Sequence, residues 1–327
     1  MEKIDNQLIA PIVLFCYNRL SHLEKTVEAL AKNELAPESD LYIFSDGAKH
    51  QEDVHKLQNV RDYINSLSSK NYFNSVIVKC AETNLGLAKS VINGVSSVIN
   101  IRGRVIVVED DVITSPFFLR FMNDALNRYE GDNCIGSIAG FTPNIKFTQD
   151  YSYNTFVAKR PTSIAWGTWV NWWCNIDWDV KNYNKLKYNL RFRSLQKSWG
   201  NDVPGRLDRY MAGYNSSWAT RFTLDGFLKD YYALHPVKTL CIHIGYDDSG
   251  THTTTTDAKI FDDVELSKVS IEVDDILPLV NEKIRKEYLR IYHRSSISAF
   301  IEFILIVVFK LKKNSPLMSL LLNWRRR

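Results

Sequence analysis

The sequence lacks the glycine-rich loops by which many enzymes bind nucleotides. No GxGxxG follows the first apolar run at residues 11–17, and no GxxxxGK[ST] occurs anywhere in the 327 residues. In those motifs, backbone N–H groups at a helix N-terminus cradle the phosphates. Their absence disfavours a nicotinamide-dependent dehydrogenase and a P-loop enzyme. A ligand with phosphates would therefore need a metal ion to neutralise them.

Paired cysteines and a basic leader are also missing. The N-terminal stretch MEKIDNQLIAPIVLF has no basic segment before its apolar run, so we expect no signal peptide. Cys16 and Cys80 lie in apolar, strand-like runs, where we expect buried thiols. No CxxC spacing occurs among the five cysteines, which favours a reducing compartment; they stand at positions 16, 80, 134, 174 and 241.

The sequence has no net positive charge outside its C-terminal segment. The net charge is +4, but residues 310–327 carry six Lys or Arg and no acid, and subtracting these six leaves −2 for the rest. The body of the protein therefore gives no reason to expect a nucleic-acid partner.

The first 110 residues alternate between strand-like and helix-like segments. Apolar periodicity predicts a helix after each of the first three strands. This alternation predicts an α/β fold, with a mainly parallel sheet and helices on both faces. The predicted strands cover residues 11–17, 41–45, 75–80 and 105–108.

Polar side chains follow each predicted strand. Open α/β sheets bind ligands outside the carboxyl ends of their strands, so we expect these side chains to meet at one edge. The fourth strand, VIVV, ends in three carboxylates that cannot be buried without a cation or hydrogen-bond donors. Hard carboxylate oxygens suit Mg²⁺ or Mn²⁺. The polar residues are Tyr17, Asn18 and Arg19, then Asp46, then Glu82, Thr83 and Asn84, and finally Glu109, Asp110 and Asp111.

Residues 151–180 are dense in aromatic side chains, and five of the eight tryptophans lie between positions 166 and 178. Two interpretations stay open. These side chains pack in the core, or Trp166 and Trp169 line a cleft in which an acceptor sugar stacks, since sugar rings have apolar C–H faces. Farther along, His243 and His252 flank a loop rich in Gly, Asp, Ser and Thr, and either could be a metal ligand.

The C-terminal region, residues 266–327, is predicted to be a helical tail outside the sheet domain. Its apolar run at 297–309 would form a helix of roughly 20 Å, too short to cross a bilayer core of about 30 Å. Apolar pieces with interleaved Lys, Arg and Trp suit the surface of an anionic membrane, so we expect membrane contact through 297–327. Packing against the core or a dimer contact is the alternative.

Four stretches resemble GT-A glycosyltransferases, and within them bacterial sugar transferases related to the α-mannoside β-1,2-N-acetylglucosaminyltransferase. They are PIVLFCYNR, FSDG, VIVVEDDVITSPFF and HIGYDDSGTH, within residues 11–255. The resemblance implies a GT-A domain over 1–265, with a nucleotide-sugar half at 1–115 and an acceptor half at 116–265.

The resemblance also implies roles for individual residues. Asp46 would contact a uracil base, and Asp111 would bind the Mn²⁺ or Mg²⁺ that bridges the donor diphosphate, with His252 as a further metal ligand. Asp110 and Glu109 would touch the ribose and the donor sugar. The remaining residues expected to bind the nucleotide-sugar are Tyr17, Arg19, Asn84 and Lys89.

An inverting transfer needs a carboxylate base on the acceptor side of the sugar. Related bacterial sequences carry an acid just before the SW of SWATRF, but this chain has Asn215-Ser216-Ser217 there. Of the nearby acids, Asp225 is our first candidate for the base, followed by Asp208 and Asp202.

The sequence thus predicts a metal-dependent, inverting glycosyltransferase that moves a sugar from a UDP-sugar to a glycan or lipid-linked acceptor. It would act in the synthesis of a bacterial surface polysaccharide, in the cytoplasm, peripherally on the inner face of the plasma membrane. Two alternatives come from other classes: a sugar nucleotidyltransferase, although CYNRLSHLEK lacks the glycines of its usual loop, and a non-catalytic carbohydrate-binding protein.

Overall fold

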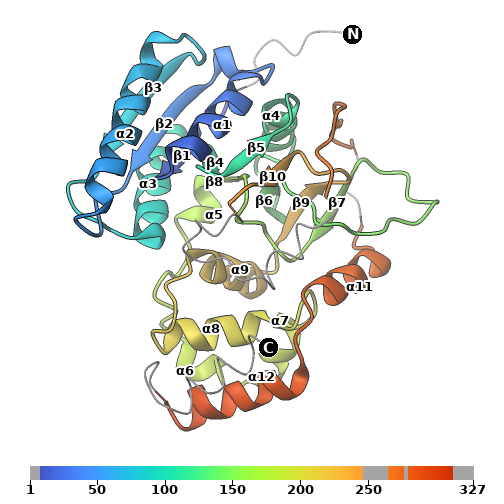
Figure 1. Cartoon of the computed structure of the whole chain (residues 1–327). Helices are drawn as coiled ribbons and strands as arrows, with labels where there is room; N and C mark the ends of the chain where they lie inside the picture. The colour runs from blue at the N-terminus through green and yellow to red at the C-terminus, as the bar shows by residue number, and fades with distance from the viewer. Residues whose placement is uncertain (1–7, 246–263, 276–278, 312–327) are drawn as a thin grey trace. The chain divides into compact units, whose positions relative to one another are not determined.

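The computed structural model describes residues 8–245, 264–275 and 279–311 (Figure 1). The chain forms two compact units. The first comprises residues 1–175 and 231–280, and the second comprises 176–230 and 281–327. This division differs from the predicted one, because the segment 176–230 leaves the sheet domain and joins the C-terminal helices.

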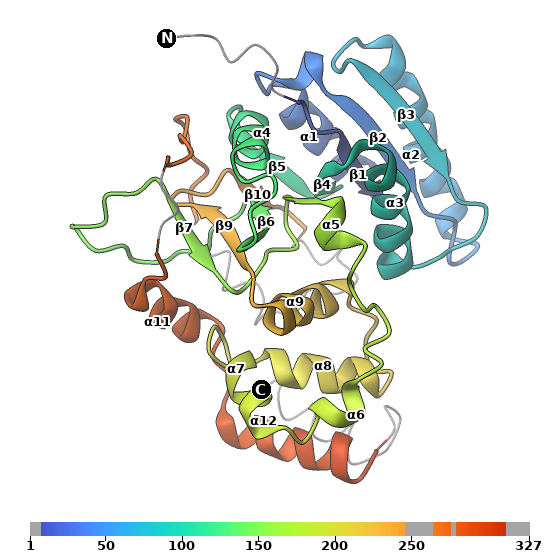
Figure 2. The same cartoon turned by 180° about the vertical axis from the view of Figure 1, so that it is seen from behind.

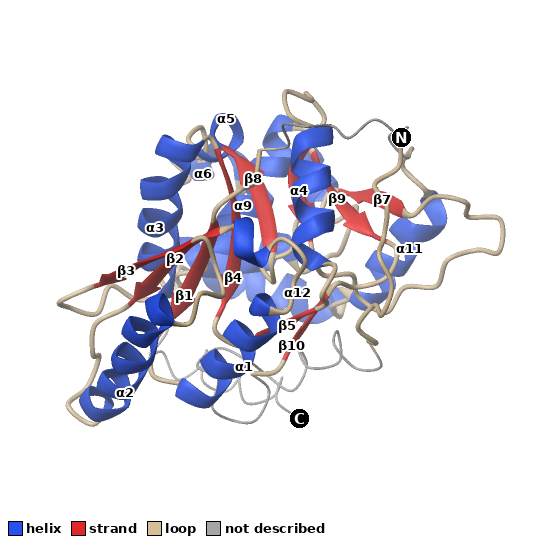
Figure 3. Ribbon diagram, turned by 90° about the horizontal axis from the view of Figure 1, so that it is seen from above, coloured by secondary structure: helices blue, strands red, loops and turns tan. Residues whose placement is uncertain are grey.

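The predicted alternation in the first 110 residues is confirmed. The strands β1 (Ile12–Cys16), β2 (Asp40–Ser45), β3 (Ser75–Cys80) and β4 (Arg104–Glu109) lie in the order β3-β2-β1-β4 and all pair in parallel. Between them come α1 (Leu20–Ala31), α2 (Asp53–Ser66) and α3 (Leu87–Arg102). Helices α1 and α2 cover one face of these strands and α3 covers the other (Figure 3).

The sheet continues beyond β4 to eight strands, in the order β3-β2-β1-β4-β8-β6-β9-β7. Four of its seven strand pairings are parallel, and β8 is antiparallel to both of its neighbours. The prediction of an α/β fold with a mainly parallel sheet is therefore confirmed. The added elements are α4 (Phe118–Arg128), β6 (Ile135–Ala139), β7 (Thr155–Ala158), β8 (Trp166–Trp169), α5 (Val170–Trp173) and β9 (Tyr232–Pro236).

Strand β9 directly follows a helix. The helix ends at Lys229, because Asp230 adopts the left-handed conformation with φ of 58°, and the chain then enters the sheet. A second, two-stranded sheet pairs β5 (Val112–Thr114) with β10 (Cys241–His243) in antiparallel register. This pairing brings a late segment of the chain beside the acidic end of β4 (Figure 2).

The core of the first unit lies on both sides of the sheet. All five residues of β1 and the first five of β4 are buried, as expected for central parallel strands. Helix α1 buries Leu23, Val27 and Leu30, which recur at helical spacing. Of the two thiols predicted to be buried, Cys16 is buried, but Cys80, at the end of the edge strand β3, is exposed.

The second unit is helical within its described residues. Its core includes the buried residues Val180, Phe192, Leu207 and Leu224. The elements are α6 (Tyr183–Leu186), α7 (Leu190–Gln196), α8 (Val203–Met211), α9 (Trp218–Lys229), α11 (Glu282–Ile291), α12 (Ser296–Phe303) and a π-helical turn (Ile304–Val308).

Helix α12 is anchored in the second unit by an ion-pair network. Glu302 is buried, and its carboxylate lies 2.7 Å from Nη2 of Arg294 and 3.3 Å from Nη1 of Arg209 on α8. Residues 281–311 are thus part of a folded unit rather than a separate tail. In the described residues no single helix is long and apolar enough to cross a membrane. The pair Glu282–Ile291 and Ser296–Val308 meets those criteria only together, with a 67° bend.

Candidate nucleotide-sugar site

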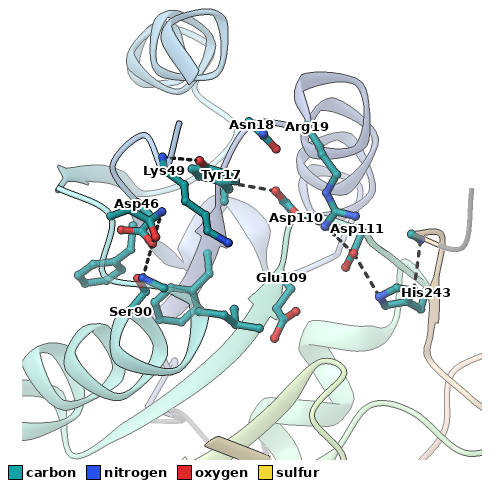
Figure 4. A pocket seen from close by; sticks show the side chains of 17 residues that line it. Tyr17, Asn18, Arg19, Asp46, Lys49, Ser90, Glu109, Asp110, Asp111 and His243 are labelled. Carbon is teal, nitrogen blue, oxygen red and sulfur yellow. Dashed lines mark hydrogen bonds and ion pairs between the residues drawn. The ribbon is translucent and has the colours of Figure 1, made fainter. Parts of the chain in front are cut away.

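The carboxyl ends of β1, β2 and β4 converge on one cavity of about 250 Å³ in the first unit (Figure 4). The parallel pairings place Cys16 beside Ser45 and Phe15 beside Glu109, so the residues that follow each strand meet at the same edge. Most of the predicted nucleotide-binding residues line this cavity, namely Tyr17, Arg19, Asp46, Asn84, Glu109, Asp110 and Asp111.

The three acids after β4 lie beside a single arginine. Nη2 of Arg19 is 2.6 Å from Oδ1 of Asp110 and 2.6 Å from Oδ2 of Asp111. The second oxygen of Asp110 accepts a hydrogen bond from the backbone N–H of Tyr17, at 3.2 Å. Arg19 directly precedes α1, so the turn from β1 into this helix sets the position of its guanidinium.

The electrostatics of the triplet differ from one acid to the next. Burial, followed by the charges of Asp111 and Asp110, raises the pKa of Glu109 to about 8. Burial also opposes ionisation of Asp111, but the hydrogen bond to His243, together with Arg19, lowers its pKa to about 2. Burial alone would lower the pKa of Arg19, and the two aspartates outweigh it and raise that pKa. Burial also raises the pKa of Asp110, and Arg19 opposes that shift. Of the three acids, Asp111 is therefore the one held most firmly in its charged form.

His243 joins this cluster from the far end of the chain. In the β5–β10 pairing His243 lies opposite Val112, next to the triplet, and its Nε2 is 3.1 Å from Oδ2 of Asp111. The predicted metal ligand His252 lies outside the described residues. His243 was noted in the sequence, but the spacing of the two histidines could not favour it, because only the strand pairing brings it to the acids.

Asp46 is held in the wall of the cavity by four hydrogen-bond donors. Its Oδ1 accepts from the backbone N–H groups of Gly47 at 2.9 Å and Leu85 at 2.8 Å. Its Oδ2 accepts from the N–H of Gly86 at 2.9 Å and from Nδ2 of Asn84 at 3.2 Å. A carboxylate offers about four lone-pair positions, so these bonds use its capacity and tie the 84–86 loop to the end of β2.

Some residues at the site were not singled out from the sequence. Asp53, in the first turn of α2, accepts hydrogen bonds from the hydroxyl of Tyr17 at 2.9 Å and from Nδ2 of Asn18 at 2.7 Å. Phe15 and Phe44 stack with ring centroids 5.5 Å apart and line the cavity with Lys49 and Ser90. Nothing in the local sequence around these residues distinguishes them as binding residues.

Four predicted site residues do not line the cavity. Trp166 and Trp169 are packed in the interior, with 1% and 4% of their surface exposed, so the prediction that they form an open acceptor cleft is corrected. Trp166 stacks on Trp173, and Nε1 of Trp169 donates to the carbonyl of Leu126. Lys89 is an exposed residue of α3.

The predicted base, Asp225, belongs to the second unit. It lies on α9, is buried, and forms an ion pair of 2.8 Å with Lys229 one turn later. Burial is the main cause of its raised pKa, and Lys229 opposes the shift.

One oxygen in the triplet fits a cation ligand. Oδ1 of Asp111 is buried and has no hydrogen-bond partner among the residues that the structure describes, whereas Oδ2 of the same group is bound to Arg19 and His243. A buried, ionised oxygen without a donor is costly unless a cation is bound to it. No group of three or more His, Cys, Asp or Glu side chains that could hold a metal occurs in the described ranges. The arrangement fits an ion such as Mn²⁺ or Mg²⁺, which takes few protein ligands and completes its shell with waters and phosphate oxygens.

No protein-family model matches the chain, and no curated protein matches it. It resembles a number of solved structures, including the following three. The mannosyltransferase PcManGT from Pyrobaculum calidifontis, in complex with GDP-Man and Mn²⁺, is 8% identical with a TM-score of 0.28, over 41% of this chain and 36% of that one. S. aureus TarS 1–349 is 14% identical with a TM-score of 0.40, over 71% and 59%.

A longer S. aureus TarS structure is 16% identical with a TM-score of 0.38, over 71% of this chain and 36% of that one. The chain thus spans less than two thirds of the length of each of these proteins. At these TM-scores the likenesses carry no conclusion about function, which has to be argued from the site.

Proposed function

We propose that the protein is a metal-dependent glycosyltransferase that uses a UDP-sugar as its donor. One observation carries the proposal: three acids line the cavity at the carboxyl edge of the sheet, and a buried oxygen of Asp111 has no hydrogen-bond donor within the described part of the chain. A dinucleotide or P-loop site would present glycine N–H groups to the phosphates instead. Acids at this position suit a nucleotide whose phosphates arrive together with a cation.

The roles in donor binding follow from the positions of the side chains. Oδ1 of Asp111 would hold the cation, and the guanidinium of Arg19, beside it, would face the diphosphate. A divalent cation would supply Lewis-acid stabilisation of the negative charge that develops on the leaving diphosphate. Glu109 and Asp110 line the same cavity, on the side proposed for the donor sugar and the ribose.

The uracil ring of the donor would lie toward the aromatic part of the cavity. Phe15, Phe44 and Leu87 present apolar surface there, next to the loop held by Asp46. Because the oxygens of Asp46 already accept four hydrogen bonds, we propose that Asp46 shapes the uracil-binding site by fixing this loop. A direct bond from the uracil ring to Asp46 would have to replace one of the four.

Transfer with inversion remains part of the proposal, with Asp225 as the candidate base. Burial raises the pKa of its carboxyl, and a raised pKa makes a carboxylate a stronger base. NMR of the product sugar would give the stereochemistry. Asp225→Asn is expected to lower kcat by about 100-fold or more. Wild-type kcat in this variant would remove Asp225 from the mechanism.

The metal-dependent donor site is tested by titration calorimetry of UDP with and without Mn²⁺. We expect binding that requires Mn²⁺, and a loss of about tenfold or more in Asp111→Asn, because one ionised ligand oxygen is removed. The exposed Asp62 on α2 provides the matched control, and Asp62→Asn should bind as the wild type does. UDP binding that is indifferent to Mn²⁺ would refute the proposal.

We further propose that the acceptor is a glycan or a lipid-linked saccharide, reached at the inner face of the plasma membrane. Helix α12 exposes Ile297 and Phe300, with 71% and 64% of their surface accessible, and basic residues follow in the sequence. Exposed apolar and basic residues together favour an anionic bilayer surface.

Point substitutions test this contact better than deletion, since removing α12 would also remove Glu302 and leave Arg209 and Arg294 without their ion pairs. The double variant Ile297→Glu, Phe300→Glu should lose most of its co-sedimentation with vesicles that contain anionic lipid. Ile101→Glu, at a residue of the first unit that is 80% exposed, is the control. Unchanged sedimentation of the double variant would contradict the membrane proposal.

A further inference from the structure

We propose that His243 is a positioning residue that orients Asp111, and that it is not itself a ligand of the divalent cation. The inference rests on the proposed function only in that Asp111 is taken to hold the ion. It assigns a role to the contact between the two small-sheet strands and the acid triplet. It also decides whether the imidazole donates a hydrogen bond to Asp111 or coordinates the cation.

The hydrogen-bond partners of His243 define its tautomer. The backbone N–H of Gly245 donates to Nδ1 at 3.2 Å, so Nδ1 offers a lone pair and carries no proton. A neutral imidazole has one protonated nitrogen, which must then be Nε2. Nε2 lies 3.1 Å from Oδ2 of Asp111, an acceptor, so donor and acceptor match along the whole chain from Gly245 to Asp111.

A metal-ligating histidine shows the opposite pattern. Its free nitrogen usually donates to a carboxylate or a carbonyl, which leaves a lone pair on the nitrogen that faces the metal. Here the nitrogen away from the acids faces an N–H donor. Coordination through Nε2 would require the proton to move to Nδ1, which would then point at the N–H of Gly245.

This arrangement gives the two oxygens of Asp111 different roles: one accepts hydrogen bonds and the other is left for the cation. Oδ2 accepts from Nε2 of His243 and from Nη2 of Arg19, while the buried Oδ1 has no partner in residues 8–245, 264–275 and 279–311. Two donors on one oxygen fix the rotation of the carboxylate. The remaining oxygen is thereby presented in one direction, as a preorganised ligand needs.

Gly245 is required for this contact on steric grounds. A Cβ at this position would lie 2.4 Å from Oδ2 of Asp111, 2.8 Å from Cε1 of His243 and 2.9 Å from Nη1 of Arg19. Real Cβ contacts are not that short, so any side chain would push the three groups apart. The backbone of residue 245 can therefore approach closely enough to donate to His243 only as glycine.

The first experiment uses the full chain without metal. Long-range ¹H–¹⁵N spectra of protein with ¹⁵N-labelled histidine report the tautomer of each of the seven histidines, and His243→Gln identifies the signal of His243. We expect the form protonated at Nε2. A form protonated at Nδ1 would overturn the inference. This result does not depend on whether the protein is a glycosyltransferase.

The second experiment examines the complex with Mn²⁺ and UDP. Pulsed EPR of protein with ¹⁴N- or ¹⁵N-labelled histidine should show no directly coordinated histidine nitrogen. A coupling that disappears in His243→Gln would overturn the inference. If the wild type binds no Mn²⁺ in the presence of UDP, the proposed function fails, and the tautomer measured without metal still decides the role of His243.

Two substitutions separate positioning from ligation by affinity. His243→Leu removes the donor and should lower Mn²⁺ affinity by about 10- to 100-fold. His243→Gln, whose amide can still donate to Asp111, should keep most of that affinity. Equal losses in both variants, or no loss in either, would overturn the inference. Should His243→Leu fail to fold, the EPR and tautomer measurements on the wild type decide.

Discussion

Replacing Asp46 with asparagine tests how the cavity wall is built. The carboxylate of Asp46 accepts hydrogen bonds from three backbone N–H groups, those of Gly47, Leu85 and Gly86, and from the side chain of Asn84. Asparagine keeps the shape but has one oxygen and one NH₂ group. In either orientation of the amide, two of the four donors face a nitrogen that cannot accept.

The expected loss can be worked out from these contacts. A hydrogen bond to a charged group contributes about 1.5 to 3 kcal/mol, so two lost bonds cost about 3 to 6 kcal/mol if water cannot replace them. Asn84 and Gly86 are half-buried and Leu85 is exposed, so water recovers part of this. We therefore expect the 84–86 loop to open more easily by about 3 kcal/mol, which is about a 100-fold change in the opening equilibrium.

Amide hydrogen exchange measures this opening residue by residue. The amides of Leu85 and Gly86 should exchange about 100-fold faster in Asp46→Asn, and UDP affinity should fall with them because Gly86 lines the cavity. Asp62→Asn, which removes an exposed carboxylate, should leave both unchanged. Unaltered exchange rates of the Leu85 and Gly86 amides would refute the role of Asp46 in holding the 84–86 loop. Faster exchange with full UDP affinity would separate the loop from nucleotide binding.

Three further predictions concern other parts of the molecule. Gly47→Ala should weaken UDP binding about tenfold or more, because a Cβ would lie 2.3 Å from the carbonyl carbon of Thr83; calorimetry checks this. Glu302→Leu should lower the unfolding free energy of the second unit by about 3 to 5 kcal/mol, since two arginines lose their buried partner, and urea denaturation measures this. The pKa of His235 is lowered by burial to about 4, so its contribution to stability is complete above pH 6.5 and is lost as pH falls toward 4. Unfolding free energy should fall by up to about 3 kcal/mol over that range, and less in His235→Asn.

Local patterns were sufficient to predict the nucleotide half of the fold. The apolar runs at β1, β2, β3 and β4 and the helical spacing between them fix a parallel arrangement, because consecutive strands joined by helices must run the same way. The polar residues after these strands then lie together as a matter of topology. Arg19, Asp46 and Asp111 were found in this way.

Contacts between distant segments could not be predicted from local patterns. The tryptophans at 166 and 169 have the composition of either a core or a cleft, and only their burial assigns them to the core. The left-handed Asp230, which ends helix α9 before strand β9, has no distinctive sequence around it.

The sequence by itself thus determined the alternating half of the sheet and the acids at its edge, because periodicity and strand order are local properties. Tertiary structure alone decided what those acids contact. Asp111 and His243 lie far apart in the sequence, with the segment 176–230 of the second unit between them, and the β5–β10 pairing joins them. Hydrogen-bond geometry then distinguishes the two oxygens of Asp111: Oδ2 accepts hydrogen bonds, and Oδ1 is left for the cation. The identity of the residue alone cannot make this distinction.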